Sequence, residues 1–511
     1  MKRKYLEGAP LIIMTIGLGL GTFIEILDAS IANVAIPNIA GDLAVATSQG
    51  TWVITSYAVS NAIVLPMTGW LGKRYGDVRV FVVSTVLFSF FSWTCGLSWS
   101  LPMLIASRIM QGAVAGTMIP LSQSLLLQNY PPEKSSLALA FWGIVVIVAP
   151  ILGPVLGGWI TESHGWSWIF YINVPIGILS SYLTWSVLKD SPSQTRKEPI
   201  DIVGFILLII GVGALQITLD KGQELDWFNS QTIIILALVA FFGLLFFTVW
   251  DIYTPHPVVD FTHFTRRNFV IGTLACAVGW MLFIGCMVLS PLWLQTREGY
   301  TPYWAGVTLM TIGIFPLLLA TTVGKGVNKW DPRLFTSLSF FLYGISFFWM
   351  GSFTTSVSLY LLMMSRLFLG LALAFYFIPL IAIAMSGIPE ESLTSASGIF
   401  NFVRMMIGGG FGPAIFVTLW ERREIFHHAR LVESVNFSRE PATAIYAQLQ
   451  AKGLYSPESD AIINTMVTSQ ASILSLNDVF WLGGFCFLVM IPFIWLSKRV
   501  DPKNIKTAII D

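Results

Sequence analysis

The stretch LIIMTIGLGLGTFIEILDASIANVAI, residues 11–36, decides the fold class of this chain. It is predominantly apolar, and its only charged residues are two acids, Glu25 and Asp28. About 20 apolar residues in a helix are enough to cross the hydrocarbon core of a bilayer. A basic segment, residues 1–4, comes before it. However, the apolar run is too long for a secretory signal peptide and lacks a small-residue cleavage site. The sequence therefore predicts that this run is a membrane span.

Similar runs recur along the chain and predict about fourteen spans in all. They lie near residues 52–72, 78–99, 102–127, 136–160, 167–188, 202–219, 232–250, 269–294, 303–324, 334–353, 358–387, 395–420 and 479–497. Of the 511 residues, 55% are hydrophobic and 11% are charged, whereas a soluble domain carries about 25% charged residues. The composition predicts an all-α membrane protein, and the net charge of +1 gives no indication of nucleic-acid binding.

The distribution of positive charge predicts the orientation. With the N-terminus in the cytoplasm, roughly 19 of the 29 Lys and Arg residues fall on the cytoplasmic side and roughly 7 on the other side. An even number of spans places both ends of the chain on the same side. We therefore expect both termini to be cytoplasmic.

An internal repeat divides the chain. The pattern Arg108-x-x-x-Gly112 recurs as Arg366-x-x-x-Gly370, 258 residues later, and the pair Gly153-Pro154 recurs 259 residues later. Repeats of this kind are typical of transporters, in which two bundles of helices enclose a site near the middle of the membrane. The repeat therefore predicts two six-helix bundles.

The expected boundaries follow from the repeat. Residues 1–190 form the N-terminal six-helix bundle, residues 191–260 hold two inserted helices with their linkers, and residues 261–511 form the C-terminal six-helix bundle. A polar stretch, residues 421–476, is expected as a periplasmic loop between the last two spans, and it contains helix-compatible segments such as Ala442 to Lys452. A polytopic enzyme or a receptor is the alternative. The sequence contains no metal-ligand, nucleophile or nucleotide motif, so we expect a transporter without a cofactor or metal.

Charged residues inside the spans are the first candidates for function, because each costs about 2.5–3.5 kcal/mol to insert at the centre of a helix. Glu25 and Asp28 are three residues apart and share one helix face. A carboxyl that gains and loses a proton inside the membrane is what proton coupling requires. The alternative is an inert pair of hydrogen-bonded residues near the outer end of the span.

Two arginines and several polar residues extend this set. Arg108 needs an anionic partner or a wet cavity, and we expect it to bias the protonation of Asp28 unless it only binds backbone carbonyls. Arg404 either meets a polar or anionic substrate group or anchors helix packing. The residues expected to line a substrate cavity are Asn33, Gln123, Asn401 and Arg404.

Glycines mark close contacts between helices. The run Gly153-Pro154-x-x-Gly157-Gly158 would let its span approach a neighbour closely and would bend it. When a transporter changes between two conformational states, its helices move against each other at such contacts.

These motifs together resemble those of a known family. Residues 27–37 resemble the first-span signature of drug:proton antiporters, residues 108–112 a fourth-span motif, and residues 153–158 the fifth-span motif of exporters. The loop before the third span resembles a gating motif through Gly69, Lys73, Arg74, Gly76, Asp77 and Arg79. With fourteen spans, the chain resembles the EmrB/QacA type of the major facilitator superfamily, and its EmrB branch in particular.

The resemblance implies an efflux pump that exports hydrophobic drugs or toxic compounds in exchange for protons. It implies a bacterial inner membrane, a periplasmic adaptor of the membrane-fusion type and an outer-membrane channel of the TolC type. Asp28 would carry the protons, with support from Arg108 and from Glu25, which the typical motif lacks. Lys73 replaces an acid of the usual gating motif, so a charge relay there would depend on Asp77.

Two other functions stay open at this point. One is a dedicated proton-coupled exporter of a single metabolite, such as a siderophore or a fatty acid. The other is a membrane sensor or scaffold that transports nothing.

Overall fold

The computed structural model describes residues 6–130, 135–190, 195, 199, 201–222, 225–255, 259, 261–327, 329–355, 357–388, 393–435 and 440–499. Within these ranges every regular element is a helix. Eleven of the described helices are long and apolar enough to cross a membrane. The other three predicted runs, near residues 52–72, 136–160 and 167–188, are helical too. The total of fourteen spans stays a prediction.

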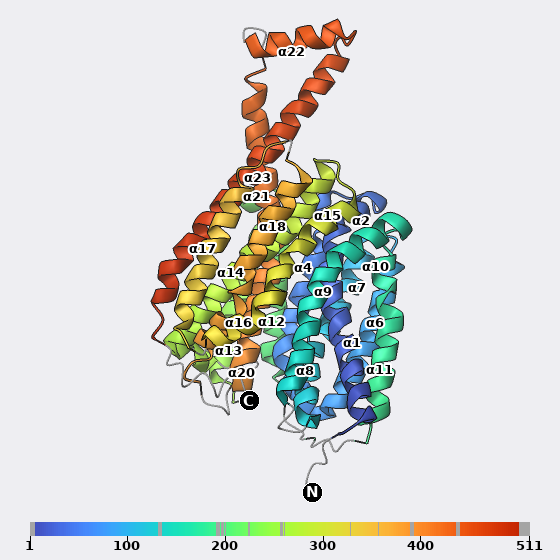
Figure 1. The fold of residues 1–511 in the computed structure, drawn as a ribbon, viewed down its shortest axis with the longest axis vertical. Coiled ribbons are helices and arrows are strands. Elements are labelled where there is room, and N and C mark those ends of the chain that lie inside the picture. The colour runs from blue at the N-terminus through green and yellow to red at the C-terminus, as the bar shows by residue number, and fades with distance from the viewer. Residues whose placement is uncertain are drawn as a thin grey trace.

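The first half of the chain forms one bundle, which is coloured blue to teal in Figure 1. Its elements are α1 (Ala9–Ile31), η1 (Ala32–Val34), α2 (Ile36–Asp42), α3 (Thr47–Gly50), α4 (Trp52–Val64), η2 (Leu65–Met67), α5 (Thr68–Tyr75), α6 (Asp77–Gly96), α7 (Leu101–Ala115), α8 (Met118–Asn129), α9 (Ser135–His164), α10 (Trp168–Tyr171) and α11 (Asn173–Leu188). Helix α1 packs between α9 and α11.

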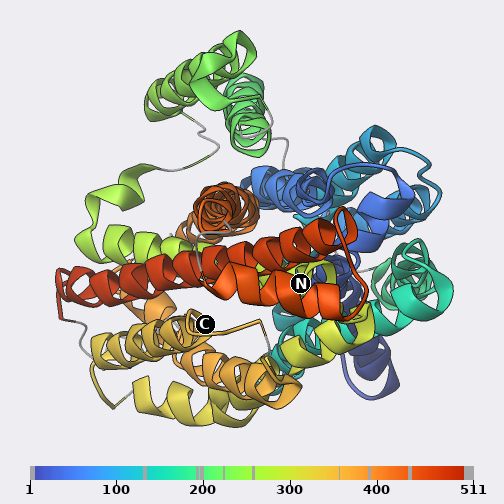
Figure 2. The same ribbon diagram turned by 90° about the horizontal axis from the view of Figure 1, so that it is seen from above.

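Two helices follow as a separate pair. They are α12 (Ile202–Lys221) and α13 (Gln231–Tyr253), joined through η4 (Trp227–Asn229). Figure 2 shows this green pair standing outside the main body of helices. Helix α12 nevertheless contacts α4 of the first bundle and α21 of the second.

The second half forms the other bundle, coloured yellow-green to red in Figure 1. Its elements are η5 (Phe261–Thr265), α14 (Arg267–Thr296), α15 (Pro302–Met310), η6 (Thr311–Gly313), α16 (Ile314–Val327), α17 (Pro332–Met350), α18 (Leu359–Ala374), α19 (Phe377–Ala384), α20 (Leu393–Arg404), η8 (Met405–Phe411), α21 (Gly412–Val432), α22 (Glu440–Ala451) and α23 (Glu458–Trp495).

The polar stretch 421–476, expected as a loop, is largely helical. Helix α21 continues to Val432, α22 crosses over, and α23 begins at Glu458. These helices project beyond the bundles, at the end opposite to the start of α1 and the end of α23 (Figure 1). We call this projecting part, residues 421–476, the hairpin.

A π-helical turn brings the two bundles together. The turn η8 contains Gly408, Gly409 and Gly410, and it packs against α14 and α4. A methyl group added at Gly409 would lie 3.1 Å from the Cβ of Ala58, and one at Gly410 would lie 2.7 Å from a methyl of Val59. The absence of side chains at Gly409 and Gly410 therefore allows the second bundle to approach α4. Turns of this type often occur at functional sites.

The predicted glycine motif of α9 makes a second junction. A Cβ at Gly153 would lie 1.9 Å from Ser30 Oγ, and one at Gly157 would lie 2.5 Å from the Ile31 carbonyl oxygen, both in the first bundle. A Cβ at Gly158 would lie 2.3 Å from the Pro302 carbonyl oxygen of α15. The motif therefore serves two contacts, one to α1 and one to the other bundle.

Candidate functional site

The centre of the first bundle holds a buried ion pair. Asp28 on α1 and Arg108 on α7 are both fully buried, and Arg108 Nη1 lies 2.5 Å from Asp28 Oδ2. The sequence singled out both residues for function, and the structure brings them into direct contact.

Neutral side chains complete the coordination of the pair. Asn173 Nδ2 on α11 donates to Asp28 Oδ1 at 2.7 Å, and Gln111 Nε2 donates to the same oxygen at 3.2 Å. Arg108 donates through Nε to the Val53 carbonyl oxygen at 2.9 Å and through Nη1 to Gln111 Oε1 at 2.8 Å. The pair is thus held by α1, α4, α7 and α11 together.

Aromatic rings shield the guanidinium. The Arg108 Cζ lies 4.1 Å from the centroid of the Tyr57 ring and 5.5 Å from that of Phe170. Charges taken out of water in this way depend on each other, because removing one partner of a buried pair costs about 3–5 kcal/mol. The site can therefore tolerate a change in the charge of Asp28 only if its surroundings rearrange.

Glu25 belongs to a different contact. It is 3% exposed, and its Oε1 accepts a hydrogen bond of 3.2 Å from Asn61 Nδ2 on α4. Among the described residues no cation forms an ion pair with it. Glu25 and Asp28 share a helix, as predicted, but they have separate partners.

The gating motif lies where α5 turns into α6. Gly76 has φ of 90°, a conformation that suits glycine, and forms the turn. Asp77 follows and accepts a 3.0 Å hydrogen bond from Gln128 on α8. Arg74 lies over the Trp70 ring, and a Cβ at Gly69 would meet nothing within 4 Å. The side chain of Lys73 lies outside the described part of the chain.

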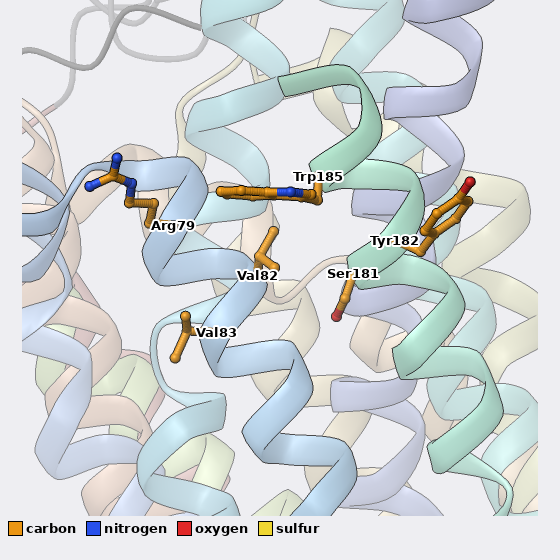
Figure 3. A pocket seen from close by; sticks show the side chains of 6 residues that line it. All are labelled: Arg79, Val82, Val83, Ser181, Tyr182 and Trp185. Atoms are coloured by element: carbon orange, nitrogen blue, oxygen red, sulfur yellow. The ribbon is translucent and has the colours of Figure 1, made fainter. Parts of the chain in front are cut away.

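Arg79, in the first turn of α6, faces a different neighbour. It borders a shallow hollow of about 440 Å³ on the surface between α6 and α11. Figure 3 shows its guanidinium pointing away from the Trp185 ring. The hollow is otherwise lined by Val82, Val83, Ser181 and Tyr182.

The residues expected to line a substrate cavity lie on three different elements. Arg404 donates to Asn401 Oδ1 at 3.1 Å and lies 5.1 Å from the Trp280 ring centroid. Asn33 lies in η1 and Gln123 in α8. In the described structure neither of them has a hydrogen bond to Arg404 or Asn401.

Sequence reasoning missed several residues of the site. Gln111 lies within the fourth-span motif, residues 108–112, but nothing in the sequence paired it or Asn173 with Asp28. Nothing in the sequence placed the Tyr57 ring against Arg108. Asp220, near the end of α12, was not considered, although a lone acid one helical turn after Gln216 in an apolar run is a usable indication.

Comparison with known proteins defines the family. A family model described as Major Facilitator Superfamily matches residues 18–413. The chain is 47% identical to the Multidrug export protein EmrB of Escherichia coli (strain K12), over 97% of each chain. It is 43% identical to the Fatty acid resistance protein FarB of Neisseria gonorrhoeae, over 96% of this chain and 97% of that one.

Solved structures agree on the fold. A bacterial homologue of the human lysosomal transporter Spinster, in an inward-facing and unoccupied conformation, gives a TM-score of 0.65 at 15% identity and covers 98% of this chain and 99% of that chain. A D-xylose-proton symporter gives 0.62 at 14% identity, with 98% and 99% covered. These likenesses confirm the predicted all-α major facilitator fold. The chain therefore belongs to the major facilitator superfamily, as a membrane transporter of the EmrB type.

Proposed function

We propose that this transporter is an efflux pump that exports hydrophobic drugs or toxic compounds in exchange for protons, by alternating access. The observation that carries the proposal is the buried pair of Asp28 and Arg108, with its 2.5 Å contact inside the first bundle. The relatives named as multidrug export proteins support the substrate class.

The pair offers a physical route from a proton to a conformational change. A proton on Asp28 removes the negative charge and leaves Arg108 buried without a counter-ion. Because an uncompensated buried charge costs about 3–5 kcal/mol, a state in which α1 and α7 separate, or in which water reaches Arg108, becomes favoured. Each proton moving across a potential of about 100 mV supplies about 2.3 kcal/mol, which is of the same order.

The glycine junction gives this change a path to the other bundle. Helix α1 carries Asp28, and two residues further, at Ser30, it begins the contact with Gly153 and Gly157 of α9. Helix α9 in turn contacts α15 through Gly158. A movement of α1 is therefore passed to the interface where the two bundles meet.

The proposed setting is a bacterial inner membrane with both termini in the cytoplasm. The hairpin then projects into the periplasm, where it offers helical surface to an adaptor of the membrane-fusion type and, through the adaptor, to a TolC-type channel. Co-purification of the intact chain with such an adaptor, lost when the hairpin is shortened, tests this part.

Replacing the central acid tests the proton coupling. We expect Asp28→Asn, purified and reconstituted in proteoliposomes, to lose efflux driven by a pH gradient, because the amide cannot exchange a proton. Asp226→Asn is the control, since Asp226 is exposed in the turn after α12. Unchanged pH-driven efflux by a folded Asp28→Asn protein would refute the proposal.

A dedicated exporter of one metabolite is the second candidate. The second bundle holds Arg366, which is 1% exposed and bonded to Ser290 and the Met350 sulfur, and it holds Arg404 among aromatic rings. In the described residues neither arginine has an acidic partner, which favours an anionic substrate such as a fatty acid or a siderophore. Growth tests separate the candidates: protection against many unrelated toxins favours the drug pump, and protection against a single acid favours the metabolite exporter.

A further inference from the structure

The inserted helix α12 carries a carboxyl that ties the two bundles together. Asp220, near the end of α12, accepts hydrogen bonds at Oδ2 from Thr55 Oγ1 on α4 (3.1 Å) and from Gln216 Nε2 on its own helix (2.9 Å). The same Gln216 nitrogen donates to the Gly410 carbonyl oxygen of η8 at 3.2 Å. One carboxyl and one amide thus link the first bundle, the inserted helix and the second bundle.

Only one of the two oxygens of this carboxyl accepts hydrogen bonds. Asp220 Oδ1 is shielded from solvent and has no hydrogen-bond partner in the described structure. A carboxylate that is fully ionised offers about four acceptor positions, so half of its capacity is unused here. A proton on Oδ1 would leave both bonds at Oδ2 in place geometrically.

The carboxyl also borders a cavity at the hairpin end of the molecule. This cavity has a volume of about 160 Å³, whereas one water molecule takes about 30 Å³ of liquid. Its lining combines the segment before α4 with α21 and comprises Ala46, Ser48, Gln49, Thr51, Asp220, Ala414, Val417, Thr418 and Glu421. The polar groups among them suit water, and the lining contains two acids and no cation.

Few charged groups surround the carboxyl. On α12, Lys221 follows it, but the Lys221 ammonium lies over the Trp52 ring at 5.6 Å. On α21 the facing group is Glu421. Helix α4 offers only Tyr57 as a titratable side chain and η8 offers none, while Asp251 and Tyr253 lie at the far end of α13. No ion pair to Asp220 occurs within the described ranges.

We propose that Asp220 is a second proton-binding site of this transporter, separate from the Asp28–Arg108 pair, and that it controls how firmly α12 holds the two bundles together. A proton from cavity water binds Oδ1, forms an O–H bond and cancels the negative charge. Hydrogen bonds to a charged acceptor are roughly twice as strong as those to a neutral one. Protonation therefore weakens the ties to Thr55 and Gln216, and loss of the proton to water restores them.

Helix α4 connects this site with the one already described. Its Val53 carbonyl oxygen binds Arg108, its Thr55 hydroxyl binds Asp220, and its Asn61 amide binds Glu25. Glu25 and Asp220 directly, and Asp28 through Arg108, therefore all act on the position of the same helix. The inference rests on the proposed proton-coupled export, because it adds a proton to that cycle.

Infrared difference spectroscopy of the purified full-length protein tests the site without transport. We expect the wild type to show a carboxyl band at Asp220 that titrates with pH, and we expect this band to be absent in Asp220→Asn. It should persist in Asp28→Asn and in the exposed control Asp226→Asn. If Asp220→Asn, shown to be folded by size-exclusion chromatography, loses no titrating carboxyl, the inference is overturned.

Transport gives the second readout. At a pH difference of one unit and with no membrane potential, loss of one coupled proton should lower the steady-state ratio of external to internal ethidium by about tenfold, because one pH unit is a tenfold difference in proton activity. We expect this for Asp220→Asn, with Thr55→Val showing a smaller loss because the acid remains. If the wild type itself shows no pH-driven efflux, the proposed function fails, while the infrared titration still decides whether Asp220 binds a proton. An unchanged ratio in Asp220→Asn would exclude its role in coupling.

Discussion

The contact of Gly158 with α15 allows a quantitative prediction. A Cβ at this position would lie 2.3 Å from the carbonyl oxygen of Pro302, a backbone atom that cannot move without shifting α15. Forcing extra volume into a packed contact costs about 1–3 kcal/mol. Gly158→Ala should therefore disfavour the conformation in which α9 and α15 are closed together, and the ratio of closed to open states should fall by about 5- to 150-fold.

Distances between spin labels at the end of α9 and the end of α14 measure this shift. The four native cysteines are first replaced. Cysteines are then introduced at Ser163 and Thr296, which are exposed side chains near the junction, and the spin labels are attached to them. We expect the Gly158→Ala variant to gain a population at longer distance and to export more slowly.

A matched control distinguishes the effect of the clash with α15 from the effect of replacing any helical glycine by alanine. A Cβ at Gly213, within α12, would meet nothing within 4 Å, so Gly213→Ala should leave the distance distribution unchanged. Gly306→Ala approaches the same junction from α15, because its Cβ would lie 2.0 Å from the Pro154 carbonyl oxygen, and it should reproduce the shift. Identical distributions for Gly158→Ala and Gly213→Ala would refute the reasoning.

Three further predictions concern individual polar contacts. Asn173→Ala removes a 2.7 Å hydrogen bond to Asp28, worth about 1.5–3 kcal/mol for a charged acceptor, and should displace the pH profile of efflux; an unchanged profile would contradict the assigned contact. Arg108→Lys keeps the charge but cannot make the bonds from Nε and Nη1 together, so efflux in proteoliposomes should fall at least about tenfold, and near-normal rates would show that charge alone suffices. At the start of α17, burial disfavours the charged form of Asp331, but hydrogen bonds from Arg333 outweigh it and hold the pKa of Asp331 below its usual value. Because the folded-state pKa is depressed, this contribution to stability is present above the unfolded-state pKa, near about 4, and disappears as the pH falls through the folded-state value. Asp331→Asn should therefore lower the melting temperature at neutral pH and have little effect in strong acid.

Much of the fold could be predicted because membrane spans are local features. The run that contains Asp28 is recognisable by itself, since a helix satisfies its own backbone hydrogen bonds and needs only apolar side chains against lipid. The two related bundles were predictable too, because the repeated motif can be read directly from the sequence. It stands at Arg108 and Gly112 and again at Arg366 and Gly370. The projecting helices of the hairpin were less predictable, since their polar sequence does not differ clearly from that of a loop.

The candidate site was only half predictable. Asp28 and Arg108 stood out because charges in apolar runs are costly. Asn173, which donates a hydrogen bond to Asp28, lies 145 residues from it in the sequence. It reaches the pair only because α11 packs beside α1. Asp220 escaped notice because its partners, Thr55 and the Gln216–Gly410 contact, belong to three elements that are remote from one another in the chain.

The sequence alone determined that this protein is a helical membrane transporter of two repeated bundles, because spanning length, apolarity and motif spacing are properties of short segments. Only the tertiary structure decided which partner each buried charge has: Arg108 for Asp28, Asn61 for Glu25, and Thr55 with Gln216 for Asp220. The physical reason is that an ion pair or hydrogen bond depends on distances of a few ångströms. Those distances are set by helix packing and not by separation along the chain.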